Sequence, residues 1–318
     1  MALKTYLVTG GAGYVGVETV RQLVASGSAR VHVLDNLACG EARLARLPVG
    51  ELSLHRCDVR DAAAVERVVA SASPDVIIHL AAIHYIPACD AAPGEAVATN
   101  VAGTVNLLNA ARGRARFVFA STAAVYAPSE DEHDESRSAI GPVDVYGLTK
   151  LHGEQFLRHF HRAGHVDGVI VRLFNVVGPG ETNPHLVPAI IRQLSGGKRQ
   201  IKLGNLFPHR DYIDVRDAAE GFIRLARLPA AAADEEPIVA NLGTGRTHAV
   251  VDVVKEIARA ASLEIDVVQD PERIRAVDRP MLRAAITRLQ RLTNWRPNGS
   301  LADSVRRAWL ERSADGLS

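Results

Sequence analysis

Short apolar segments alternate with helical patterns through the first half of the chain. Apolar runs predict strands at residues 6–9, 31–34, 76–80, 117–120 and 169–172, and the stretches between them predict helices at 17–26, 62–71, 97–112 and 147–162. Strands that alternate with helices of about 10–15 residues are typical of a parallel sheet with helices on both faces. Runs this apolar suit the centre of such a sheet. We therefore expect an α/β fold built on a doubly wound parallel sheet.

Glycine and proline become denser after residue 176, for example at Gly178, Pro184 and Pro208, and indicate a second, more interrupted unit. A helix predicted at 216–228 and a strand predicted at 238–242 should return to the large sheet. We expect residues 1–175, with returning segments near 212–228 and 238–245, to form the larger domain. The remainder of 176–318 should form a smaller α/β domain, and 318 residues suffice for both.

Composition excludes several classes of protein. The formal net charge is +1, which gives no electrostatic case for nucleic acid or an acidic membrane surface as a partner. Three cysteines without CxxC spacing imply neither a disulfide framework nor a zinc site, so we expect no metal. The first predicted strand leaves no room for a signal peptide, and no apolar run reaches the length of about 18 residues that a membrane span needs. We expect a cytoplasmic protein.

A glycine-rich turn follows the first predicted strand, in the sequence TGGAGYVG at residues 9–16. In such a turn Gly10 permits the tight bend, Gly13 lets a pyrophosphate approach the backbone, and Gly16 allows close packing of helix on strand. The N-terminus of the following helix offers oriented N–H groups and partial positive charge. We expect a Rossmann-type dinucleotide site in which Tyr14 and Val15 also contact the cofactor.

A carboxylate ends the second predicted strand. Asp35 lies 19 residues after Gly16, where a ribose-binding acid belongs, and Asn36 follows it. The carboxylate can accept hydrogen bonds from both ribose hydroxyls, and it would repel a 2′-phosphate. The sequence therefore favours NAD over NADP as the cofactor, with Asp35 and Asn36 in its site.

Tyr146 and Lys150 stand four residues apart at the start of a predicted helix, on one face. A free tyrosine is a poor base at neutral pH. A nearby ammonium and a positive nicotinamide ring favour the phenolate, so we expect the pKa of Tyr146 to be lowered. The sequence STAAVY at 121–126 follows a strand, where a hydroxyl would face the same crevice.

These motifs resemble the extended short-chain dehydrogenase/reductases, and among them the nucleotide-sugar epimerases and dehydratases. The resemblance covers nearly the whole chain and rests on TGGAGYVG, VLDNL, CDV, HLAA, NVAGT, STAAVY, YGLTK, RLFNVVGPG, RDYIDV and NWRP, in that order. The VLDNL segment resembles UDP-glucose/galactose 4-epimerases more than it resembles the dehydratases. The resemblance implies NAD as cofactor, a nucleotide-diphosphate sugar as substrate, and a homodimer joined through the helices at 97–112 and 147–162.

The resemblance also implies roles for particular residues. Tyr146 would be the acid/base, Lys150 would bind the nicotinamide ribose, and Thr122 would bond the reacting hydroxyl. Asp58 would bond the adenine edge of the cofactor. Further cofactor contacts would come from Val59, Leu80, Ala81, Ala82 and Asn100.

On the substrate side, the resemblance implies that Asn175 supports the diphosphate and that Arg210 pairs with a phosphate. Arg275, with Asp278, would complete the group of residues that holds the diphosphate. For both Arg210 and Arg275, the alternative interpretation is a surface ion pair. His84 follows the HLAA segment, where the family places residues that contact the sugar, and an ordinary loop histidine is the alternative.

One departure bears on the reaction. Hexose 4,6-dehydratases of this family place an Asp-Glu pair directly after the threonine, and Ala123 and Ala124 stand there instead. Elimination has no evident agent, which favours a 4-epimerase acting through a transient 4-keto sugar, with a UDP-hexose as the expected substrate. A ketosugar reductase is the alternative, and LGNL at 203–206 resembles GDP-sugar enzymes, so the base stays open. The acidic run 129–136 is either a solvated loop or a flap over the site.

Overall fold

A seven-stranded parallel sheet forms the larger part of the molecule, as expected from the sequence. The computed structural model describes residues 3–38, 44, 52–113, 115–229, 235–271 and 279–312. The strand order is β10-β6-β5-β4-β1-β2-β3. The strands are β1 (Lys4–Thr9), β2 (Ala29–Asp35), β3 (Leu52–Arg56), β4 (Val76–His79), β5 (Arg116–Thr122), β6 (Asp167–Leu173) and β10 (Ile238–Leu242).

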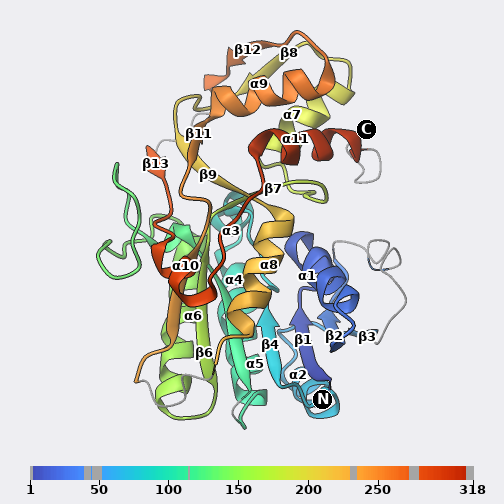
Figure 1. The fold of residues 1–318 in the computed structure, drawn as a ribbon, viewed down its shortest axis with the longest axis vertical. Helices are drawn as coiled ribbons and strands as arrows, with labels where there is room; N and C mark the ends of the chain where they lie inside the picture. Colours follow the sequence, from blue (N-terminus) through green and yellow to red (C-terminus); the bar gives the residue numbers. More distant parts are fainter. Residues whose placement is uncertain are drawn as a thin grey trace.

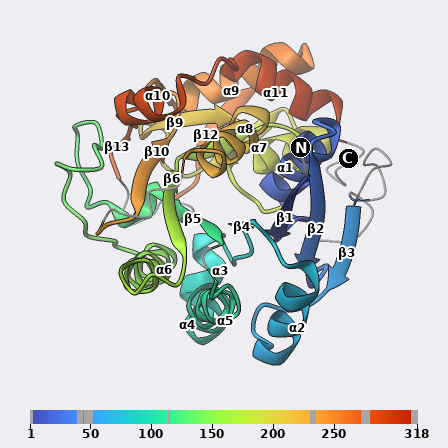
Figure 2. The same ribbon diagram turned by 60° about the horizontal axis from the view of Figure 1, so that its bottom comes forward.

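Helices cover both faces of this sheet (Figure 2). One face carries α1 (Tyr14–Ala25), α8 (Val215–Ala226) and α10 (Thr287–Thr293), and the other carries α2 (Ala62–Ala72), α4 (Pro93–Val97), α5 (Gly103–Ala110) and α6 (Val145–Arg162). The short helix α3 (Ile86–Ala91) follows β4. This arrangement is the doubly wound fold.

The apolar strands form because both of their faces are buried. In β1, the side chain of Leu7 enters one core cluster and that of Val8 enters the other, because successive residues of a strand point to opposite faces. Ile77 and Ile78 of β4 divide in the same way. Burial of each such side chain stabilises the fold by about 1.5–3 kcal/mol. Strands that are buried on both faces therefore consist of apolar residues, which is why they could be predicted from the sequence.

A second unit stands above the large sheet in Figure 1. Its strands are β7 (Asn175–Val177), β9 (His209–Asp214), β11 (Thr247–Ala249) and β13 (Met281–Leu282) in one sheet and β8 (Gln200–Leu203) with β12 (Asp266–Gln269) in another; its helices are α7 (Leu186–Ser195), α9 (Val250–Ala261) and α11 (Leu301–Leu310). These elements share a core cluster of their own, which includes Ile190, Val253 and Val305.

The structure differs from the sequence expectation in three places. The edge strand β3 was not predicted, because its mostly exposed side chains give no apolar run. The helix expected at 97–112 is instead α4, a π-helical turn at Ala98–Ala102 and α5. Leu289 of α10 joins the core of the large sheet, although the sequence placed this part of the chain in the smaller domain.

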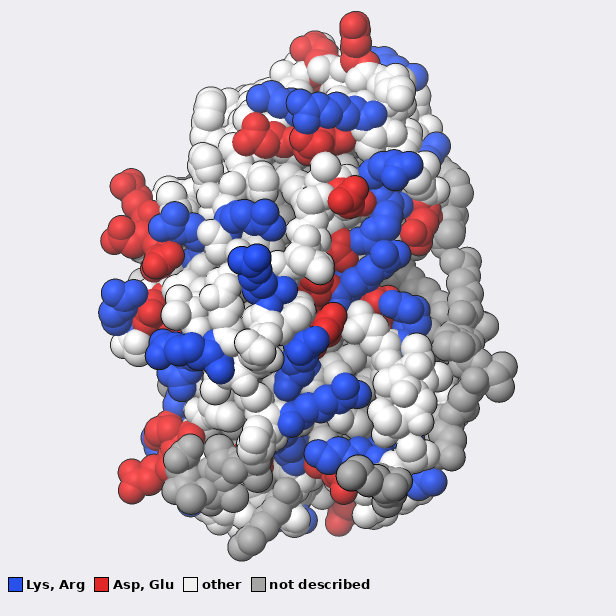
Figure 3. Space-filling model, viewed as in Figure 1, with Lys and Arg blue, Asp and Glu red and all other residues white. Residues whose placement is uncertain are grey.

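The outer surface carries charges of both signs. Basic and acidic side chains are interspersed on the face shown in Figure 3, in keeping with the formal net charge of +1. Among the described residues, no helix combines the length and the apolar character needed to span a bilayer.

Candidate active site

The expected site residues follow the carboxyl ends of neighbouring strands. β1, β2, β4, β5 and β6 run parallel and end at Thr9, Asp35, His79, Thr122 and Leu173 respectively. Parallel strands present their carboxyl ends at one edge of the sheet, where open α/β folds bind ligands. The glycine turn, Asp35, the loop after β4 and Thr122 therefore share this edge.

The glycine turn has the form that a pyrophosphate requires. Gly10 has φ +69°, and a Cβ there would lie 2.6 Å from the backbone nitrogen of Ala81. A Cβ on Gly16 would lie 2.0 Å from the Gly10 carbonyl oxygen. The following helix, α1, has no side-chain cap at its N-terminus, so its first N–H groups remain suited to an anion. These residues fit a dinucleotide.

The Asp35 carboxylate is hydrogen-bonded to the backbone of the glycine turn and of the loop that follows β2. Its Oδ2 accepts a hydrogen bond from the Ala12 nitrogen at 2.9 Å, and its Oδ1 accepts one from the Leu37 nitrogen at 2.7 Å. An ionised carboxylate has about four acceptor positions, so both oxygens retain capacity for ribose hydroxyls. The side chain is therefore held in place by the backbone before any ligand binds.

Asp58 lies beside this edge. Its carboxylate accepts hydrogen bonds from the Arg60 guanidinium and from Asn36 Nδ2, the latter at 3.2 Å. Hydrogen bonds from Arg60 outweigh burial and lower the pKa of Asp58 to about 2. Asp58 is thus an acceptor throughout the physiological range, as an adenine-binding role requires.

The side chain of Asn100 connects the loop after β4 to helix α6. Asn100 lies in the π-helical turn, and its side chain exchanges hydrogen bonds with the backbone nitrogen and oxygen of Ile83 at 2.8 and 2.9 Å. Its Nδ2 also donates to Thr149 Oγ1 on α6 at 3.0 Å. These bonds let Asn100 position the loop that contains Leu80, Ala81 and Ala82, and the cofactor contact implied by the resemblance stays a prediction.

Tyr146, Lys150 and Thr122 meet at the start of α6. The Thr122 side chain lies close enough to the Tyr146 side chain to act on its pKa. The Lys150 ammonium nitrogen lies 6.0 Å from the centre of the Tyr146 ring and 4.9 Å from that of Phe119. The Asp144 side chain caps the helix by accepting from the Gly147 nitrogen at 2.7 Å. The structure thus brings the three predicted catalytic residues together.

Their electrostatics differ from the sequence expectation. Burial raises the pKa of Tyr146 above its usual value, and the Thr122 side chain opposes this shift only in part. Burial also lowers the pKa of Lys150 to about 7, so the lysine carries only part of a positive charge at neutral pH. The protein side chains alone therefore do not lower the pKa of Tyr146, and the expected lowering depends on the charge that a nicotinamide ring would add.

The Lys150 shift predicts a pH dependence of stability in the cofactor-free protein. Between about pH 7 and 10.5 the unfolded chain binds a proton on Lys150 that the folded chain does not, so the free energy of unfolding rises with pH. We expect this residue to contribute a rise of about 2 kcal/mol from pH 7 to 9. Urea unfolding at both pH values should show the rise in wild type and its loss in Lys150→Met. Equal slopes in the two proteins would contradict the shift.

A buried ionic cluster underlies this site, and sequence reasoning missed it. Glu154 of α6 binds the Arg172 guanidinium through both oxygens, at 3.0 and 2.8 Å, and Oε1 also accepts from Ser121 Oγ at 2.5 Å. Arg172 lies over the ring of Tyr126 at 4.8 Å. The cluster joins α6 to β5 and β6, and its Ser121 is the chain neighbour of Thr122.

Arg279 was missed as well. Its Nη2 donates to the Ala124 carbonyl oxygen and to Asp144 Oδ2, both at 3.0 Å. The backbone oxygen of Arg279 in turn accepts from the Arg210 guanidinium at 2.7 Å. Arg279 therefore holds the cap of α6 from a segment 135 residues away in the chain, and nothing in the local sequence could have indicated this.

The substrate-side residues are only partly described. Asn175 begins β7, two residues after Leu173, whose Cα pairs with that of Thr122. Arg210 lies on β9, and His84 lies in the loop after β4. Arg275 and Asp278 lie outside the described residues. The structure thus brings Asn175 and His84 to the edge that carries Thr122.

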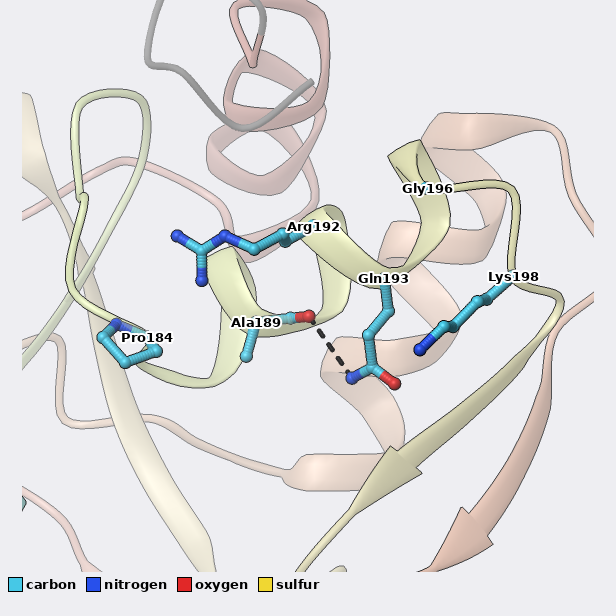
Figure 4. A pocket seen from close by; sticks show the side chains of 6 residues that line it. All are labelled: Pro184, Ala189, Arg192, Gln193, Gly196 and Lys198. Atoms are coloured by element: carbon cyan, nitrogen blue, oxygen red, sulfur yellow. Dashed lines mark hydrogen bonds between the residues drawn. The ribbon is translucent and has the colours of Figure 1, made fainter.

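A pocket of about 350 Å³ lies on α7 of the second unit (Figure 4). Its lining comprises Pro184, Ala189, Arg192, Gln193, Gly196 and Lys198. Two basic side chains and no acid belong to this lining, and Gln193 Nε2 donates to the Ala189 oxygen at 3.3 Å across it. The pocket has the charge that a phosphate group would require.

The acidic run 129–136 is partly anchored. His133 is 1% exposed and stacks on Tyr126 with ring centres 4.7 Å apart. Glu135 Oε1 accepts from the Asn241 nitrogen at 2.7 Å, and Ser129 forms a bridge with Met281. The run is therefore not a freely solvated loop along its whole length, and its role as a flap stays a prediction.

Fold and site together define a dinucleotide-dependent enzyme of the Tyr/Lys type. The model of the NAD dependent epimerase/dehydratase family matches residues 6–243. The chain belongs to that family, which confirms the resemblance seen in the sequence and the dependence on NAD.

Relatives and solved structures agree with this assignment. The chain is 31% identical to the UDP-glucose 4-epimerase 4 of Oryza sativa subsp. japonica, over 96% of this chain and 89% of the relative. It is 32% identical to the UDP-glucose 4-epimerase of Streptomyces lividans, over 96% and 94%. The solved UDP-glucose 4-epimerase of Thermus thermophilus in complex with NAD is 29% identical, with a TM-score of 0.83 over 96% of this chain and 97% of that chain.

Proposed function

We propose that the protein is an NAD-dependent nucleotide-sugar 4-epimerase, with a UDP-hexose as the best candidate substrate. The observation that carries this proposal is the group of Thr122, Tyr146 and Lys150 at the start of α6, with Ala123 and Ala124 where a dehydratase needs an acid and a base. The 4-epimerases among the relatives support the same reaction.

The chain's own residues supply acid/base chemistry and orientation. When bound at this edge, NAD would supply reversible hydride transfer at C4 of the sugar. Tyr146 takes the proton from the C4 hydroxyl and later gives it back, while Thr122 bonds the same hydroxyl and orients it. Asp35 holds the adenosine ribose, and Lys150 binds the nicotinamide ribose. Asn175 and Arg210 would hold the diphosphate while the 4-keto sugar turns over.

The two positions that follow Thr122 carry no acid or base for dehydration. Ala123 and Ala124 are 1% and 6% exposed and carry no proton-transferring group. The nearby carboxylate of Asp144 is bound to Arg279 and caps α6. A ketosugar reductase would use the same tyrosine and lysine, and it is distinguished by its consumption of reduced cofactor.

A panel of nucleotide sugars tests this proposal. Purified protein is incubated with UDP-, GDP- and dTDP-hexoses in D₂O, and products are analysed by NMR. We expect a C4 epimer to form from a UDP-hexose, with no deuterium at C5. A 4-keto-6-deoxy product would overturn the argument from Ala123 and Ala124. A different preferred nucleotide would overturn the UDP assignment and leave the epimerase assignment standing.

Asp35 predicts strong discrimination between cofactors. A 2′-phosphate would face its carboxylate, and a like-charge contact costs several kcal/mol, so we expect NADP to bind about 100-fold more weakly than NAD, which corresponds to roughly 3 kcal/mol. Asp35→Asn should narrow this gap, and Asp252→Asn on α9 should not. Calorimetric titration of the apo-protein measures both affinities. Equal affinities in wild type would refute the assignment of Asp35 to the ribose.

We further propose a homodimer formed through α4, α5 and α6. These helices pack against one another on one face of the sheet (Figure 2). Val97, Leu148 and Phe156 on them are 48%, 44% and 39% exposed, so these helices present large apolar side chains at the surface. A second copy of the chain would bury them.

Light scattering tests this assembly. We expect a dimer at micromolar concentration and a monomer for the double variant Leu148→Glu/Phe156→Glu. Leu310→Glu, which changes an exposed leucine on α11, should remain dimeric. A monomeric wild type, or a double variant that stays dimeric, would be incompatible with this interface.

A further inference from the structure

Three side chains with metal-binding atoms come together from two separate parts of the chain. His84 follows β4 of the large sheet, whereas Glu181 and His185 lie between β7 and α7 of the second unit. His84 Nε2 is 3.4 Å from Glu181 Oε2, and His185 Nε2 is 3.9 Å from the same oxygen. One ligand atom from each of the three residues lies within 4.8 Å of the other two.

The surrounding contacts orient this cluster. The Glu181 side chain is 9% exposed, and its Oε1 accepts from the Asn183 nitrogen at 2.8 Å, so its Oε2 is directed at both imidazoles. The two imidazole rings stack with centres 5.6 Å apart, and the Tyr85 ring packs edge-on against His185 at 5.3 Å. Each ligand atom therefore has a defined direction before any ion binds.

The geometry suits a first-row divalent ion. Two imidazole nitrogens and one carboxylate oxygen are a ligand set of zinc, with bonds of about 2.0–2.2 Å that place tetrahedral ligand atoms about 3.4 Å apart. The separations in this cluster are equal to that value or somewhat longer, and both histidine side chains are 38% exposed and can close on an ion. Three protein ligands leave a fourth position for water or an oxygen ligand.

Asn183 also contacts the cluster. Its Nδ2 lies 3.1 Å from His84 Nε2, within hydrogen-bonding distance. The same imidazole nitrogen faces Glu181 Oε2 at 3.4 Å, and an imidazole nitrogen and a carboxylate oxygen so placed can bind one cation together.

We propose that His84, Glu181 and His185 bind a divalent transition-metal ion of the zinc type, which connects the two units of the chain. Spacing along the chain does not indicate this site, because His84 stands about one hundred residues before its partners. The proposal does not depend on the epimerase reaction, and its test uses the metal alone.

Metal titration provides that test. Tag-free protein is treated with a chelator, then titrated with Co²⁺ by visible absorption and with Zn²⁺ by calorimetry, without cofactor or sugar. We expect one ion per chain. Losing even an orienting neighbour of a ligand typically weakens metal affinity about 10–100-fold, so Glu181→Gln and His185→Ala should each weaken it by at least that much. His152→Ala, an exposed histidine on α6, should bind as wild type does.

Two further readouts make the result decisive. Circular dichroism of the metal-free variants establishes that they fold. The thermal midpoint of wild type should rise on addition of Zn²⁺, because a ligand that binds only the folded state stabilises it, and the midpoints of the two variants should not. The proposal is overturned if wild type binds no ion in a one-to-one ratio, or if the folded variants bind Zn²⁺ as tightly as wild type does.

Discussion

Tyr146→Phe is expected to lower kcat for epimerisation by about 10²–10⁴-fold, the usual contribution of general acid/base catalysis. The substitution keeps the packing of the ring and removes only the phenolic hydroxyl, which lies close to the Thr122 side chain. No contact of the glycine turn or of Asp35 changes, so NAD should remain bound. Steady-state kinetics with a coupled product assay gives kcat, and cofactor released from denatured protein gives the NAD content.

Tyr6→Phe is the matched control. Tyr6 lies on β1 and is 2% exposed, within a core cluster of the large sheet. Its replacement removes the same group outside the site, and kcat should stay within a few-fold of wild type. If Tyr146→Phe retained more than about a tenth of wild-type kcat, the result would contradict the role of Tyr146 as the proton carrier.

Glu154→Ala is expected to lower the free energy of unfolding by about 3–5 kcal/mol, because breaking a buried pair leaves an uncompensated charge. The side chains of Arg172 and Glu154 are 4% and 1% exposed, so water cannot replace the lost carboxylate. Ser121 would lose its acceptor too. Urea unfolding monitored by circular dichroism measures the loss.

An exposed ion pair provides the control for the stability loss expected in Glu154→Ala. Glu220 and Arg224 form an i,i+4 pair on α8 with side chains that are both 40% exposed. Such pairs contribute about 0–1 kcal/mol, so Glu220→Ala should have little effect on stability. A loss in Glu154→Ala as small as that of Glu220→Ala would show that the cluster beneath the site contributes little to stability.

The centre of the fold could be predicted because local sequence and burial agree there. β1 and β4 are buried on both faces and so give continuous apolar runs. β3 gives no such run, because it lies at the edge of the sheet with exposed side chains. The interruption of the helix near Asn100 depends on hydrogen bonds to Ile83 and Thr149, which no helical period reveals.

The catalytic residues could be predicted for a related reason. Tyr146 and Lys150 are four residues apart on one helix, and a fixed spacing of this kind is visible in sequence. Arg279 and Asp144 meet only through the fold, and His84 and Glu181 do so as well. Their spacing along the chain does not show that they meet. Only the folded structure brings these side chains together.

The central claim is that the reaction is redox-neutral epimerisation at C4, and one measurement tests it most directly. Purified protein with its bound NAD is incubated with UDP-galactose and no added cofactor, while the C4 epimer and the absorbance of reduced nicotinamide are followed together. The account predicts many turnovers to UDP-glucose per enzyme with no net change in that absorbance. Turnover that requires one equivalent of reduced cofactor per product would contradict it and identify a reductase.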